Sequence, residues 1–137
     1  MSTEQSNPQQ EQEKNEWLRA QYEKATKHLA SQGVIAQSVS LDDSRYIPPL
    51  IAIWKLKDTQ NNEYWVLSGD VPADYSPLSV APDAREALRH FSLKWQMQAE
   101  NIYNTGTQDK TQIDFANLLV GRAQGLYDLH SQEQFWK

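Results

Sequence analysis

The sequence predicts an α+β fold with an N-terminal helix, a two- to three-stranded antiparallel sheet and two long C-terminal helices packed on that sheet. Three observations lead to this prediction. Apolar residues recur with helical spacing over residues 15–32. Two runs rich in β-branched and aromatic residues, 50–57 and 63–68, flank a polar turn. Helical patterns then fill most of residues 82–132.

The first helix is expected over Asn15 to Gln32, where one apolar stripe is formed by Leu18, Tyr22, Ala25 and Leu29. Gly33 follows directly and is a natural helix stop. Before this helix, residues 1–13 are dominated by Gln, Glu and Ser, and burial of apolar surface cannot offset the entropy of ordering them. We therefore expect a disordered tail over 1–13 and one α+β domain over 14–137.

The strands are expected to begin with Val34–Leu41, followed by a loop at residues 42–45. Leu50–Lys57 and Glu63–Ser68 then form a hairpin, because the five residues between them have turn chemistry. The loop length predicts a register in which Lys57 faces Glu63. One face of the hairpin would then carry Leu50, Ala52, Trp54, Leu56, Tyr64, Val66 and Ser68.

The C-terminal half is expected to begin with a long irregular connection over Gly69–Pro82, which holds three prolines. A long helix follows over Pro82–Tyr103, with Asp83 and Glu86 at the positive end of its dipole. A second apolar strip on the far side of this helix predicts either a central helix or one that offers a face to a partner. The last helix is expected over Asp109–Gln132.

Composition excludes several classes of function. The chain has 137 residues, a net charge of −5 and no cysteine. It therefore has no disulfide, thiol nucleophile, zinc finger or iron–sulfur site. Its acidity argues against a nucleic-acid or anionic-membrane surface, and it has no 18-residue apolar run. We expect no signal peptide, because the N-terminus lacks the apolar segment that one needs. We expect a small cytoplasmic protein with no cofactor.

No catalytic or metal-binding motif is recognisable, so we name no catalytic residue and no metal ligand. The sequence lacks H-E-x-x-H, G-x-x-x-x-G-K, G-x-G-x-x-G and G-x-S-x-G. Its three histidines, His28, His90 and His130, fall on three different predicted helices. His130 lies in line with apolar residues of the last helix, which is typical of a core histidine.

The most unusual segment is the end of the second hairpin strand and the loop after it. A ligand site there would combine a hydroxyl, carboxylates and arginines from the following helix, and its residues would be Ser68, Asp70, Asp74, Tyr75, Arg85, Arg89 and Trp95. The alternative is structural: the carboxylates cap local turns or pair with the arginines and tie the loop down. The sequence favours this structural interpretation.

Two functional hypotheses follow. The first is a non-catalytic protein-binding module of the adaptor, regulator or toxin-neutralising type, with a homodimer left open. Its contact residues would be Leu93, Met97, Phe135 and Trp136, from the outer strip of the long helix and the apolar chain end. The second is a small-ligand-binding protein or an enzyme with an acid–base or anion site at the Ser68–Tyr75 loop.

Two segments also carry a resemblance. Residues 65–75, W-V-L-S-G-D-V-P-A-D-Y, are followed by a helix that contains R-H-F-S-L-K-W at residues 89–95. Together they resemble an uncharacterised family of short bacterial proteins that have a W-V-x-S-G-D-x-P-x-D-Y segment and then an R-H-F-S-x-K-W helix. The resemblance implies a bacterial cytoplasmic protein and carries no activity over to this chain.

Overall fold

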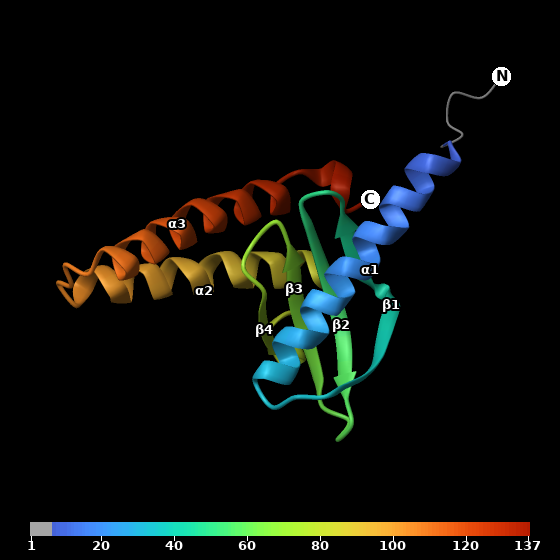
Figure 1. Cartoon of the computed structure of the whole chain (residues 1–137), viewed down its shortest axis with the longest axis horizontal. Coiled ribbons are helices and arrows are strands. Elements are labelled where there is room, and N and C mark those ends of the chain that lie inside the picture. Colours follow the sequence, from blue (N-terminus) through green and yellow to red (C-terminus); the bar gives the residue numbers. More distant parts are fainter. Residues whose placement is uncertain (1–6) are drawn as a thin grey trace. The chain divides into compact units, whose positions relative to one another are not determined.

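The computed structural model describes residues 7–137 and shows an α+β fold with three long helices and a four-stranded antiparallel sheet. The elements follow the predicted order of helix, sheet and two helices (Figure 1). The chain divides into two compact units. Unit 1 extends to Leu78, and unit 2 runs from Ser79 to Lys137.

Unit 1 begins with α1, Pro8–Ser31, which starts earlier than the sequence predicted. Asn7 caps this helix, because its side-chain Oδ1 accepts a hydrogen bond from the Gln10 backbone N–H at 2.8 Å, and Pro8 stands in the first turn. Residues 8–13, which we expected to belong to the tail, are therefore helical. The rest of that expectation, for residues 1–6, lies outside the described residues.

The sheet of unit 1 has the order β1-β2-β3-β4. Its strands are β1, Ala36–Ile47, β2, Ile51–Asp58, β3, Glu63–Gly69, and β4, Asp74–Pro77. The prediction of two or three strands was wrong in count. β4 lies inside the segment that we expected to be irregular, where it pairs Tyr75 with Val66 and Asp74 with Leu67. A short 3₁₀ helix, Leu78–Val80, follows it.

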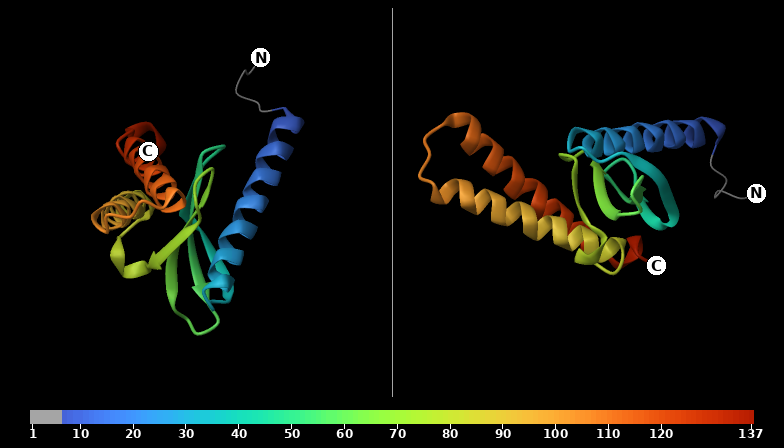
Figure 2. Two further views of the ribbon diagram at one scale, coloured as in Figure 1. Left: turned by 60° about the vertical axis from the view of Figure 1, so that its left-hand side comes forward. Right: turned by 90° about the horizontal axis from the view of Figure 1, so that it is seen from below.

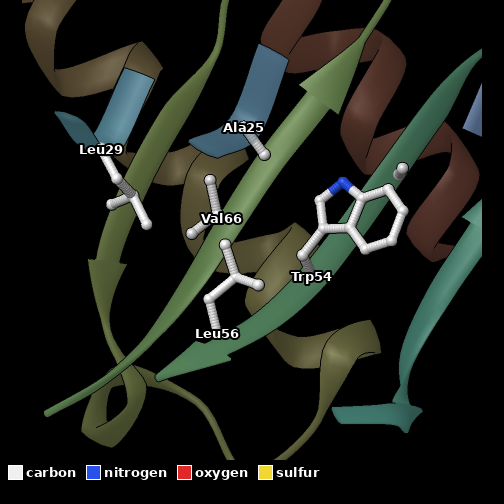
Figure 3. Close-up of a cluster of buried hydrophobic side chains, with 6 residues drawn as sticks. Ala25, Leu29, Trp54, Leu56 and Val66 are labelled. Atoms are coloured by element: carbon white, nitrogen blue, oxygen red, sulfur yellow. The ribbon is translucent and has the colours of Figure 1, made fainter. Parts of the chain in front are cut away.

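The hairpin register is confirmed, because Lys57 pairs with Glu63 and Trp54 pairs with Val66. The predicted apolar face packs on α1, which lies across the sheet (Figure 1). Figure 3 shows the resulting core, in which α1 faces side chains of β2 and β3. Its buried members are Ala25, Leu29, Ala52, Trp54, Leu56 and Val66.

β1 runs past the loop that we expected at residues 42–45, and it does so through a large bulge. Ser40 pairs with Lys55 and Arg45 with Ile53, so four residues of β1 stand opposite the single residue Trp54. The Ser44 hydroxyl closes this bulge. It donates to the Ser40 carbonyl at 2.7 Å and accepts from the Lys55 backbone N–H at 3.0 Å. The bulge thus keeps its hydrogen bonds although the ladder is interrupted.

Unit 2 is a helical hairpin of α2, Ala84–Asn104, and α3, Lys110–His130, with a second 3₁₀ helix at Glu133–Phe135. The two helices lie side by side in both views of Figure 2. Asp83 and Asp109 cap their first turns through side-chain oxygens. The Ser92 hydroxyl donates to the Ala123 carbonyl at 2.7 Å and links the two helices at a buried position.

Candidate functional site

The predicted ligand loop begins at Ser68, whose side chain is fully buried and hydrogen-bonded as both acceptor and donor. Its hydroxyl accepts a hydrogen bond from the indole Nε1 of Trp54 at 3.0 Å and donates one to the Gln21 backbone carbonyl at 2.9 Å. These two bonds connect β2, β3 and α1 inside the core. A buried indole N–H needs an acceptor, so Ser68 has a structural task that explains its residue type.

The residues after Ser68 are tied to α1 by Lys24. Its ammonium donates to the carbonyls of Gly69 and Val71, both at 2.7 Å. Burial lowers the pKa of Lys24, although the charge of Asp70 opposes this effect. The Asp70 residue is exposed, and its backbone N–H donates to the Leu50 carbonyl at 2.8 Å. Lys24, which the sequence reasoning missed, therefore holds the loop at both sides of Asp70.

Asp74 and Tyr75 belong to β4 rather than to a loop. The Asp74 carboxylate accepts from the Tyr75 backbone N–H at 2.7 Å. The Tyr75 ring stands edge-on to Tyr64 and to His28, with 5.8 Å between centroids in each pair. Both residues thus take part in the packing of unit 1.

The other members of the predicted ligand set lie on α2, in unit 2. The guanidinium of Arg85 donates to the His130 carbonyl and to the Glu133 carboxylate, both at 3.0 Å. Arg89 is exposed, whereas Trp95 is buried. Because the seven residues are divided between the two units, a common site built from them stays a prediction.

Arg85 also contributes to the seating of the chain end on the hairpin of unit 2. The Trp136 indole Nε1 donates to the Leu129 carbonyl at 3.1 Å, and the Arg85 guanidinium lies 5.9 Å from the Trp136 ring centroid. The hydrogen bond from Arg85 lowers the pKa of Glu133. Phe135 and Trp136 are half-buried. Trp136 therefore packs on its own unit.

The predicted outer strip of α2 is exposed. Leu93 is 43% exposed and Met97 is 65% exposed, although both are large apolar side chains. They are four residues apart and so share one side of the helix. Exposed large apolar side chains are also present on α3 of the same hairpin: Phe115, Leu118, Val120 and Tyr127. Both long helices of unit 2 therefore expose large apolar side chains.

Unit 1 contains an apolar groove that the sequence reasoning did not anticipate. Its volume is about 370 Å³, and it lies between α1 and the bulged part of the sheet. The residues that line it are Leu18, Arg19, Tyr22, Val39, Leu41, Tyr46 and Trp54. The Trp54 ring stands 5.3 Å from that of Tyr22 and 4.9 Å from that of Tyr46, measured between centroids. We refer to this site as the α1–β1 groove.

The described residues, 7–137, contain no cluster of three or more His, Cys, Asp or Glu residues suited to a metal ion. Among their helices, none combines the length and the apolar character that crossing a membrane requires.

Residues 11–136 match a family described as a domain of unknown function (DUF4826). This match covers nearly all of the chain, so the chain belongs to that family, in agreement with the resemblance to an uncharacterised family. Neither the curated proteins nor the solved structures include a match to this chain.

Proposed function

Since the family has no known function, we propose from the chain's own residues that this protein is a non-catalytic protein-binding module. We propose further that the outer strip of α2, Leu93 and Met97, receives an amphipathic helix of a partner protein. The observation that carries this proposal is the exposure of these two side chains. Water contact with large apolar groups is unfavourable, and a partner helix would relieve it.

The residues around the strip indicate the chemistry of the partner. Arg89 lies four residues before Leu93, and Glu100 lies three residues after Met97, so all four share one side of α2. Both charged residues are exposed. A complementary helix would carry apolar side chains at i and i+4, an acidic residue opposite Arg89 and a basic residue opposite Glu100. Met97 suits such a surface because its side chain adapts to the partner's shape.

The ligand-site alternative at the Ser68–Tyr75 loop receives less support. Ser68 is buried, and its hydroxyl already makes two hydrogen bonds, one as acceptor and one as donor. The Lys24 ammonium already donates to two carbonyls of the loop. These groups would have to leave their partners before they could contact a ligand, and each loss costs free energy. We therefore place the binding function on α2.

The test uses the full chain with a photo-crosslinking residue at position 97, and the matched control carries it at the exposed neighbour Gln98. Position 97 should yield one discrete crosslinked protein in cells, and position 98 should not. With that partner purified, Met97→Glu should weaken binding at least tenfold, whereas Gln98→Glu should leave it unchanged. Equal crosslinking from both positions, or equal affinity of both variants, would refute the proposal.

A further inference from the structure

The α1–β1 groove of unit 1 is built by specific bonds rather than left over by loose packing. The bulge in β1 diverts residues 41–44 from the ladder, and the groove lies between this bulge and α1, with the buried Trp54 among its lining residues. Asp43 braces this bulge, because its carboxylate accepts from the Ser40 hydroxyl at 2.7 Å and from the Lys55 ammonium at 3.3 Å. These bonds, with those of Ser44, fix one wall of the groove.

The aromatic wall is fixed as well. Trp54 cannot turn freely, because its Nε1 is held by the buried hydroxyl of Ser68, which is itself bonded to α1. The Tyr22 ring of α1 meets the Trp54 ring edge-on, and the Tyr46 ring of β1 is tilted against it. A cavity whose walls are set before binding spends little free energy on ordering side chains. Its volume of about 370 Å³ falls within the range of small-molecule sites.

Charge selects the ligand that this groove would accept. Aromatic walls alone would also suit a quaternary ammonium group, but among the described residues that line the groove the one charged residue is the cation Arg19. Arg19 is exposed, so its guanidinium can meet an anionic group at the mouth. The protein's net charge of −5 disfavours polyanions such as nucleotides. An apolar body with one negative charge therefore fits best.

From these observations we infer that the α1–β1 groove binds an apolar monocarboxylate, with its hydrocarbon body against Tyr22 and Leu41 and its carboxylate at Arg19. The open groove of about 370 Å³ has room for roughly twelve non-hydrogen atoms, if each takes about the 30 Å³ of a liquid water molecule. A carboxylate of eight to ten carbons has that size. This site lies in unit 1 and is independent of the helix-binding strip proposed on α2.

The test measures binding of hexanoate, octanoate and decanoate to the full chain by titration calorimetry, below the concentrations at which micelles form. Affinity should rise about threefold to fourfold for each added methylene, because each one leaves water for an apolar wall. Decyltrimethylammonium should bind at least tenfold more weakly than decanoate. Absence of saturable binding by all three acids, or equal binding of the cationic probe, would overturn the inference.

Variants locate the site. Arg19→Gln should lower decanoate affinity threefold to tenfold and leave that of decanol unchanged, whereas Lys27→Gln, an exposed charge of the same helix outside the groove, should change neither. Leu41→Glu should abolish decanoate binding without unfolding the protein, since Leu41 is exposed at the groove. Equal losses in the two cation variants would show a general charge effect and refute the site. Met97→Glu should bind decanoate normally, so failure of one proposal is distinguishable from failure of the other.

Discussion

Replacement of Gly69 by alanine should destabilise unit 1 strongly, because this position has no room for a side chain. Its φ angle is +128°, a conformation that L-residues rarely adopt. A Cβ atom at Gly69 would stand 2.5 Å from the Leu50 carbonyl oxygen and 2.6 Å from the Ile51 Cα, whereas ordinary contact begins at 3.4 Å. Both neighbours are backbone atoms at the start of β2, so neither can rotate away as a side chain could.

The loss of unfolding free energy in Gly69→Ala is the sum of two costs. Backbone strain of a non-glycine residue in a rare conformation contributes about 1–3 kcal/mol. Relief of the clash contributes about 1–3 kcal/mol more, as in overpacked cores. It would also disturb the 2.8 Å bond from the Asp70 N–H to the same Leu50 oxygen. The lower entropy of the unfolded alanine chain offsets roughly 0.4–1 kcal/mol. Gly69→Ala should therefore lose about 1–5.5 kcal/mol of unfolding free energy.

The assay is urea unfolding followed by circular dichroism, with Gly33→Ala as the matched control. Gly33 also has a positive φ, +82°, but nothing lies within 4 Å of the position that its Cβ would take. Gly33→Ala should lose only about 0–1.6 kcal/mol of unfolding free energy, which is the strain of a left-handed residue less the entropic offset. If the two variants lose the same free energy within about 0.5 kcal/mol, the close approach of the β2 backbone to Gly69 is refuted.

Two further predictions concern buried hydrogen bonds of unit 1. Ser68→Ala should cost about 1–3 kcal/mol in urea unfolding, because it leaves the Trp54 indole N–H buried without its acceptor; a loss below about 0.5 kcal/mol would contradict this. Burial opposes ionisation of Asp58, but hydrogen bonds from Asn62, Tyr64 and Gln60 outweigh it and lower the Asp58 pKa below 3.8. The stability that Asp58 contributes should be complete well above pH 3.8 and be lost as pH falls through its folded pKa, and Asp58→Asn should lack this acid-dependent part in unfolding measured across that range. Identical pH dependence of the two proteins would show that Asp58 does not contribute.

The hairpin register was predictable because it depends on local chemistry. The five residues between β2 and β3 favour a turn, and the length of that turn sets Lys57 opposite Glu63. The sequence also contains a signal for the start of α1, since Asn7-Pro8 is a capping residue followed by a first-turn proline. We placed the start at Asn15 because residues 8–13 lack apolar periodicity. Capping and the good helix formers that follow suffice here without burial.

β4 carries no such local signal. It has four residues, 74–77, ends in proline and follows another proline at position 72, a composition that is typical of a loop. Its pairing with β3 comes from tertiary context. Lys24 of α1 holds the carbonyls of Gly69 and Val71, and the chain returns along β3. Because Lys24 is 45 residues from Gly69 in sequence, a pattern of neighbouring residues cannot predict this contact.

The α1–β1 groove shows the same limit at the candidate site. Leu18 and Tyr22 fall on the predicted apolar stripe of the first helix, and Trp54 falls on one predicted face of the hairpin, so the sequence indicates the character of three lining residues. The cavity exists because the β1 bulge sets four residues opposite Trp54 and because Ser68 fixes the indole from the neighbouring strand. Asp42-Asp43-Ser44 looks like a loop in sequence, since these residues favour turns. Here the Asp43 and Ser44 side chains replace the missing ladder bonds, so a polar segment continues the strand and opens the space beside it.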